Sequence, residues 1–126
     1  MSKKIIVTDK APAPIGPYSQ AVQAGNMLFI SGQIPINPAT GNVEATDIQG
    51  EATQVMENLK AILTEAGTTF ASIVKTNIYL SDMNLFAQVN EVYGKYFEKD
   101  FPARETVAVK GLPKGVNVEI SMIAAL

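Results

Sequence analysis

Apolar residues recur at steps of three and four between residues 48 and 63, the spacing that gathers them on one face of an α-helix. Thr46 or Asp47 stands just before this segment as a candidate N-cap, and Thr46 with Gln49 has the spacing of a capping box. Gly67 follows where a residue in the left-handed conformation ends many helices. The pattern predicts an amphipathic helix that buries one face.

A second apolar stripe, rich in aromatic rings, runs through residues 85–97 behind Asp82 or Asn84 as a candidate cap. We interpret these rings as part of the core rather than as a cofactor site, because large apolar side chains are most often buried. Shorter apolar or alternating segments predict strands, at residues 4–7, 18–24, 27–33, 73–80, 103–110 and 116–125.

The order of these elements is β-ββ-α-β-α-ββ, which predicts one α+β domain over residues 1–126. Two helices can cover only one face of a mixed sheet, so both are expected to pack on the same side. The other face is predicted to carry small or polar residues, among them Ser31, Asn77, Tyr79, Asn117 and Ser121. That face either contacts water or packs against copies of the chain in a closed ring, and the pattern leaves both open.

Cysteine and histidine are both absent from the 126 residues. The chain therefore has no thiol nucleophile, no Ser-His-Asp arrangement and no zinc site built on sulfur or imidazole. A metal site made of carboxylates alone stays open, but the acidic residues are scattered singly, so we predict no metal and no cofactor. An acid or base must then be a carboxylate, a lysine, a tyrosine or a bound water molecule.

The net charge of −2 argues against nucleic acid as a partner, because binding a polyphosphate requires a basic patch. Lys3 and Lys4 are followed by only three apolar residues, too few for a secretory signal. No segment approaches the roughly 18 consecutive apolar residues of a membrane-spanning helix. We therefore expect a cytoplasmic protein that binds neither a membrane nor a nucleic acid.

Arg104 is the one arginine in a chain with nine lysines. A planar guanidinium meets a carboxylate or phosphate with two parallel hydrogen bonds, so Arg104 is a candidate anion anchor; an ordinary ion pair is the alternative. Glu119 interrupts an apolar strand pattern, and it either faces water or holds and activates a water molecule. Because its strand follows that of Arg104 after a short turn, we expect that the two side chains can meet across a hairpin.

Two other positions are candidates for the edge of a pocket. Tyr18 follows Ile15-Gly16-Pro17, where a rigid loop enters a strand. Its ring is either fixed at the edge of a pocket or packed in the ordinary way. Ser31-Gly32 ends an apolar strand. The glycine either allows a ligand to approach the backbone closely or only allows the chain to turn. No glycine-rich phosphate loop is present.

Two long segments of the chain carry a distinctive order of residues. The N-terminal one is Ala13-Pro14-Ile15-Gly16-Pro17-Tyr18-Ser19-Gln20-Ala21, continued by Gly25-Asn26-Met27-Leu28-Phe29-Ile30-Ser31-Gly32-Gln33-Ile34-Pro35. The C-terminal one is Phe101-Pro102-Ala103-Arg104 with Leu112-Pro113-Lys114 and Val118-Glu119-Ile120. Both segments closely resemble the RidA (YjgF) family, and the resemblance runs nearly end to end, since Val74-Lys75-Thr76 and Asp82-Met83-Asn84 match between them.

The resemblance implies a chorismate-mutase-like α+β fold, assembled as a homotrimer with three clefts between subunits. It also implies a 2-iminobutanoate/2-iminopropanoate deaminase, which hydrolyses reactive 2-imino acids to 2-keto acids and ammonia. Pyridoxal-phosphate enzymes form such imines, by way of 2-aminoacrylate or 2-aminocrotonate, when they dehydrate serine or threonine. By the family pattern Arg104 binds the substrate carboxylate and Glu119 positions the hydrolytic water. The same pattern places further residues at the cleft, some from the neighbouring subunit: Tyr18, Ser31, Gly32, Phe86, Asn90 and Thr106.

Thr106 departs from the family pattern, since many deaminase members carry cysteine two residues after the arginine. The range of substrates is therefore left open. Three other functions also stay open: a regulator that binds a metabolite in the same clefts without turnover, RNA cleavage with inhibition of translation, and a chaperone-like surface. The absence of histidine and of a basic patch counts against RNA cleavage.

Overall fold

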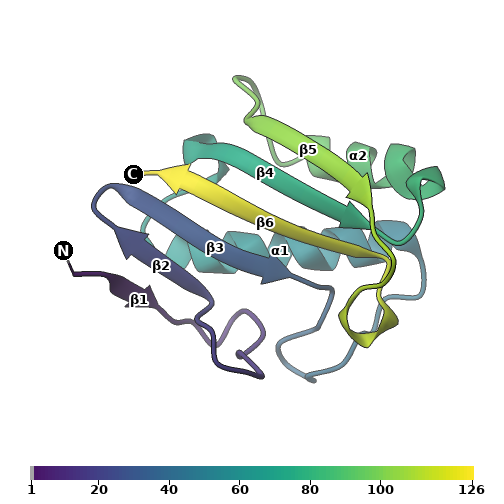
Figure 1. The fold of residues 1–126 in the computed structure, drawn as a ribbon, viewed down its shortest axis with the longest axis horizontal. Helices are drawn as coiled ribbons and strands as arrows, with labels where there is room; N and C mark the ends of the chain where they lie inside the picture. The colour runs from purple at the N-terminus through teal and green to yellow at the C-terminus, as the bar shows by residue number, and fades with distance from the viewer. Residues whose placement is uncertain (1) are drawn as a thin grey trace.

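A six-stranded sheet carries both α-helices on one of its faces (Figure 1). The computed structural model describes residues 2–126. Along the chain the elements are β1 (Lys4–Ile6), β2 (Ala21–Ala24), β3 (Met27–Gln33), α1 (Ile48–Glu65), β4 (Ile73–Leu80), α2 (Phe86–Gly94), β5 (Ala103–Ala108) and β6 (Val118–Ala125). The predicted α+β class, with two helices on one side of a mixed sheet, is confirmed.

The helix α1 begins and ends where its sequence predicts. The carboxylate of Asp47 accepts a hydrogen bond from the backbone N–H of Gly50 at 2.7 Å, so Asp47 rather than Thr46 is the N-cap. Gly67 has φ = +82°, the left-handed conformation expected of a residue that closes a helix. The predicted apolar stripe is buried, at Ala52, Val55, Met56, Leu59, Ile62 and Leu63. Within residues 2–126, no helix combines the length and the apolar character that crossing a membrane requires.

The strand order is β1-β2-β3-β6-β4-β5, which differs from the expected hairpin between the last two strands. After α2 the chain returns as β5, parallel to β4, while β6 pairs antiparallel with both β3 and β4. The expectation that β5 and β6 are neighbours is therefore wrong. Burial explains the order: every second residue of β6 is buried and the strand takes a central place, whereas β5 has no buried residue and lies at the edge.

The two faces of the sheet differ in what covers them. Side chains that point toward the helices form the core with them, among them Leu28, Ile30, Ile78, Leu80, Val118, Ile120 and Met122. In the part of the chain that the structure describes, no α-helix lies over the opposite face (Figure 1). Phe29 and Val107 are each 46% exposed there, beside an ion pair of Lys75 with Glu105 at 2.8 Å. This face therefore carries apolar as well as polar side chains, and no α-helix among residues 2–126 covers them.

The proline-rich loop before β2 extends further than predicted. The strand expected over residues 18–24 shrinks to β2, because the side chain of Gln20 holds the loop instead. Gln20 is buried, and its Oε1 accepts a hydrogen bond from the backbone N–H of Thr8 at 2.8 Å. Its Nε2 donates to three carbonyl oxygens, at 3.0, 3.3 and 2.9 Å, those of Thr8, Ala11 and Pro12. Tyr18 consequently lies in the loop and not in a strand.

Candidate functional site

Arg104 lies on the edge strand β5 and points to the side of the sheet that carries α2. Its neighbour on β4 is Thr76, which is buried on that side. The Nη1 of Arg104 donates a hydrogen bond to Oδ1 of Asn90 on α2 at 2.7 Å, so Asn90 orients the guanidinium. This bond uses one nitrogen, and among residues 2–126 no other hydrogen bond engages the planar fork, so its other N–H groups can bind an anion.

Two aromatic rings of α2 flank the guanidinium. Its central carbon lies 5.5 Å from the ring centroid of Phe86 and 5.1 Å from that of Tyr93, within the range of cation–π attraction. The Tyr93 hydroxyl donates to Oγ1 of Thr76 at 3.0 Å, which fixes the ring, and burial raises the pKa of this tyrosine. The sequence pattern placed Tyr93 in the core only. Its helical spacing from Phe86 and Asn90 was the available signal for a place beside the arginine.

A cavity of about 470 Å³ opens beside the guanidinium, lined by Asn90, Tyr93, Gly94, Phe101, Pro102 and Arg104. Thr106 is two residues further along β5 on the same side of the strand, next to this cavity rather than in its lining. Its Oγ1 is buried and has no hydrogen-bond partner among residues 2–126. Buried hydroxyl groups without a partner are uncommon in proteins. This hydroxyl group can therefore form a hydrogen bond with a ligand close to Arg104.

Glu119 lies on β6 and points to the uncovered side of the sheet, opposite Tyr79 on β4. Its carboxyl group lies over Gly32, where β3 has an irregular register between Ile30 and Gln33. A Cβ atom at position 32 would collide with this carboxylate and would lie 2.9 Å from its Cδ, so the site requires glycine. Burial raises the pKa of Glu119 above its ordinary value, which suits a proton acceptor.

The loop that carries Tyr18 lines a cavity together with Glu119. Ser31 ties this loop to β3, because its Oγ donates to the carbonyl oxygen of Ser19 at 2.6 Å. The resulting cavity is about 410 Å³ and is lined by Pro12, Ala13, Ile15, Tyr18, Gln20, Ser31, Gly32, Gln33, Ile34, Ile36, Pro113 and Glu119. Among the described residues of this lining, Glu119 alone carries a charge. Gln20 supports the loop and was not predicted as a site residue, since nothing in the sequence distinguishes it from a surface glutamine.

The predicted site residues form two groups on opposite sides of the sheet. The arginine half-site, between β5 and α2, consists of Arg104, Phe86, Asn90 and Thr106. The glutamate half-site, over the uncovered face, consists of Tyr18, Ser31, Gly32 and Glu119. The expectation that Arg104 and Glu119 meet across a hairpin is wrong, because β4 separates their strands and their side chains point in opposite directions.

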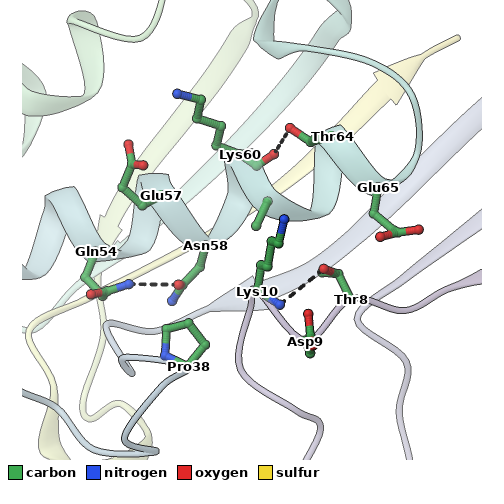
Figure 2. A pocket seen from close by; sticks show the side chains of 11 residues that line it. Thr8, Asp9, Lys10, Pro38, Gln54, Glu57, Asn58, Lys60, Thr64 and Glu65 are labelled. Atoms are coloured by element: carbon green, nitrogen blue, oxygen red, sulfur yellow. Dashed lines mark hydrogen bonds between the residues drawn. The ribbon is translucent and has the colours of Figure 1, made fainter.

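A further cavity, of about 550 Å³, lies away from both half-sites, between residues 8–10 and the outer side of α1 (Figure 2). Lys10 reaches from the loop toward the helix, whereas the charged ends of Glu57, Lys60 and Glu65 spread outward in different directions. Charges of both signs surround this cavity without converging on a common point. Within the described chain, residues 2–126, no three acidic side chains gather as a group that could hold a metal ion.

Known proteins share both the sequence and this fold. The profile of the family described as endoribonuclease L-PSP matches residues 8–126. A RutC family protein of Pyrococcus abyssi is 52% identical over 124 residues, which cover 98% of each chain. The solved structure of YyfA, a protein of the conserved Rid family from Yersinia pestis, superposes with a TM-score of 0.97 at 49% identity, covering 99% of this chain and 100% of that one. The chain belongs to the Rid family.

A second similar structure was solved with a ligand. E. coli TdcF with bound serine has a TM-score of 0.94 to this chain at 44% identity, and the match covers 98% of both. Solved structures of a RidA from a Psychrobacter species and of the E. coli YjgF gene product also match the chain, so the resemblance to the RidA (YjgF) family is confirmed, and the six-stranded sheet with two helices matches the structures of that family. Both half-sites lie within the part of the chain that the family profile matches.

Proposed function

We propose that this Rid protein hydrolyses reactive 2-imino acids to 2-keto acids and ammonia, in clefts between the subunits of a homotrimer. The observation that carries the proposal is the division of the candidate site into an arginine half-site and a glutamate half-site on opposite sides of one sheet. The arginine half-site supplies an anion anchor and the glutamate half-site supplies a proton acceptor, and the reaction requires both. Only an assembly of several copies brings the two halves together. The reaction itself requires no cofactor.

In the arginine half-site, Arg104 binds the substrate carboxylate. A mobile arginine side chain carries about 2 kcal/mol of rotamer entropy, and part of this is lost when it binds a ligand. Asn90 and the rings of Phe86 and Tyr93 hold the guanidinium in advance, so less entropy is lost on binding. Thr106 then offers its unpartnered hydroxyl to a second polar group of the substrate.

In the glutamate half-site, Glu119 positions a water molecule and accepts its proton. The imine carbon is already electrophilic, so the water oxygen bonds to it while a proton passes to the carboxylate and on to the nitrogen. The carbinolamine that results breaks its C–N bond, and its hydroxyl proton passes by way of Glu119 to the leaving nitrogen, so that ammonia departs and the hydroxyl oxygen becomes the carbonyl oxygen of the 2-keto acid. Tyr18, Ser31 and Gly32 limit the space in which this water lies.

Exposed apolar side chains around both half-sites support the assembly. Ile15 is 75% exposed beside the glutamate half-site, and Phe101 is 63% exposed beside the arginine half-site. Phe29 and Val107 add further apolar surface on the uncovered face of the sheet. Clusters of such side chains mark surfaces that bind another protein, and a closed ring of copies would bury them.

Mixing two inactive variants tests both the activity and the shared cleft. Arg104→Ala removes the anchor and should reduce activity about 30-fold or more, the effect of losing 2–5 kcal/mol from a desolvated charge pair. Glu119→Gln removes the proton acceptor. A threonine dehydratase supplies the imine, and the release of 2-ketobutyrate is followed. After random assembly of the two variants, about a quarter of the clefts join an intact Arg104 to an intact Glu119, and about a quarter of the wild-type activity should return.

The outcomes separate the parts of the proposal. If the wild type does not accelerate release of the keto acid, the deaminase activity is refuted. If the wild type is active but the mixed oligomers are not, the shared cleft is refuted, and a clean monomer by mass in solution has the same consequence. Unchanged activity in Arg104→Ala removes the carboxylate anchor from the mechanism.

A metabolite-binding regulator is a second candidate function, and the serine bound to TdcF favours it. The arginine half-site would hold the carboxylate of an amino acid or a keto acid without any chemical step. Calorimetry with serine and 2-ketobutyrate distinguishes the two functions. Binding that is lost in Arg104→Ala, together with no imine hydrolysis by the wild type, supports the regulator.

The family description as an endoribonuclease raises RNA as a further alternative. The net charge of −2 and the absence of histidine count against it, because RNA binding relies on a basic patch. Incubation with labelled RNA tests this alternative directly. Cleavage that is equal in the wild type, Arg104→Ala and Glu119→Gln would place such an activity outside both half-sites.

A further inference from the structure

Glu51, in the first turn of α1, is a buried carboxylate that the proposed hydrolysis does not use. The residue is 6% exposed, and no lysine or arginine within residues 2–126 forms an ion pair with it. A buried charge is costly unless it is paired or well hydrogen-bonded. The start of a helix favours a negative charge, which offsets part of this cost. The carboxylate also accepts two hydrogen bonds from Asn117.

Both carboxylate oxygens of Glu51 bind Asn117, which lies just before β6. Oε1 accepts a hydrogen bond from the backbone N–H of Asn117 at 2.9 Å, and Oε2 accepts one from its Nδ2 at 2.7 Å. Asn117 is held from its other side by Ser81, at the end of β4. The Ser81 hydroxyl donates to Oδ1 of Asn117 at 2.7 Å, and the Ser81 N–H donates to its carbonyl oxygen at 3.0 Å. Every polar group of Asn117 is therefore engaged.

Asn117 joins two parts of the cavity that contains the glutamate half-site. The turn before it contributes Pro113 to the cavity, and Glu119 follows two residues after it. In the chain from residue 2 to 126, each hydrogen bond that connects residues 110–117 to another segment involves Asn117. Lys114 in this turn has φ = +58°, which strains a residue with a side chain, so the turn depends on its attachment.

We propose that Glu51 is a positioning residue which, through Asn117, fixes the Pro113 turn and the carboxylate of Glu119 in the geometry that hydrolysis requires. The role given to Glu119 rests on the proposed function, whereas the mechanical link from Glu51 to Glu119 does not. A displacement of about 1 Å in a reacting group can reduce a rate about 100-fold. A small loosening at Asn117 is therefore enough to affect turnover.

A donor–acceptor swap separates this link from a general loss of stability. Glu51→Gln keeps the shape but presents one donor and one acceptor to the two N–H donors of Asn117, so one hydrogen bond is lost. Adding Asn117→Asp restores the match, because the new amide donates to the new carboxylate and still accepts from the backbone N–H. Thr68→Val is the matched control: it removes the 2.7 Å hydrogen bond to Ser72, and neither residue lines a half-site cavity.

We expect Glu51→Gln to lower kcat about tenfold or more while KM changes less than about twofold, because the arginine half-site is untouched. The double variant should recover most of kcat. Thr68→Val should leave kcat and KM unchanged, even if its Tm falls as far as that of Glu51→Gln. The split between kcat and KM and the recovery by the swap are effects that lower stability alone does not produce.

A carboxyl ¹³C NMR titration of Glu119 gives a second measurement that needs no turnover. Tyr18 is the other titratable residue in this cavity lining, and Tyr79 lies opposite Glu119 on β4. In Glu51→Gln the loosened turn admits water, so the midpoint of Glu119 should move down toward its ordinary value. The midpoint should stay unchanged in Thr68→Val.

Two results would overturn the inference. One is a Glu51→Gln variant with unchanged kcat and unchanged Glu119 titration despite a lower Tm. The other is a double variant that regains its Tm without regaining kcat. If the wild type hydrolyses no imine, the proposed function fails, and the NMR titration then decides by itself whether Glu51 positions Glu119.

Discussion

Gly32→Ala should inactivate the protein without unfolding it. The new Cβ would collide with the carboxylate of Glu119, at 2.9 Å from its Cδ and 3.2 Å from its Cγ. Carbon atoms in contact lie about 3.5–4.0 Å apart, so the carboxyl carbon must retreat by about 0.6–1.1 Å. Gly32 is not among the glycines with positive φ, and a methyl group therefore strains no backbone there. The side chain of Glu119 is what has to move.

The size of this movement sets the expected effect. A misplacement of about 1 Å can reduce turnover about 100-fold, so kcat for imine hydrolysis should fall by about one to two orders of magnitude. KM should change little, because Arg104 is not affected. The free energy of unfolding should change by about 1 kcal/mol or less, since the displaced group is the end of a flexible side chain. Gly111→Ala is the control, because a Cβ there would meet no atom within 4 Å.

The coupled assay with a threonine dehydratase measures kcat and KM, and urea unfolding measures stability. Full activity of Gly32→Ala would refute the reasoning, because Glu119 would then work from a different position. Loss of activity together with a large loss of stability would also count against it, since the methyl group would have disturbed more than one side chain.

Three further predictions concern the side chains of Glu119, Gln20 and Tyr93. Burial raises the pKa of Glu119 from its ordinary value of 4.5, so its contribution to the stability of the folded state is fully present below that pH and is lost as pH rises through the folded pKa. Urea unfolding should therefore show that Glu119→Gln stabilises the protein at about pH 7 and has no effect at about pH 4. Gln20→Met should lower the free energy of unfolding by about 2–4 kcal/mol, because Thr8 and its neighbours lose their buried partner, and unchanged urea unfolding would contradict this. Tyr93→Leu should raise KM about 2- to 10-fold whereas Tyr93→Phe should not, since only the first removes the ring beside Arg104; equal KM values would show that the ring is not needed.

The parts of the fold that depend on neighbours in the sequence were predictable. Asp47 as a cap, Gly67 in the left-handed conformation and the buried stripe of α1 follow from capping chemistry and helical period. The helices and most strands appear where the pattern places them, with ends that differ by a few residues. Arg104, Glu119, Tyr18 and Ser31-Gly32 were candidates from their residue type and position, although each had an ordinary alternative. Their roles, and the further residues Phe86, Asn90 and Thr106, came from the family resemblance.

The pairing of distant segments was not predictable from the pattern. Consecutive strands suggested a hairpin between β5 and β6, yet β6 buries more apolar surface and takes the centre of the sheet. This order decides that Arg104 and Glu119 lie on opposite sides. Gln20 and Glu51 were missed for a similar reason, since each acts through partners that are remote in sequence, up to 66 positions away for Glu51.

The central place of β6 also decides how the molecule can come apart. Within the sheet β3 and β4 do not pair with each other, and each pairs with β6, so this one strand joins a group of three strands to a group of two. Opening β6 therefore divides the sheet, and its amide hydrogens should exchange with solvent only through global unfolding, more slowly than those of the edge strands β1 and β5. Glu119 is thus carried by the segment that opens last.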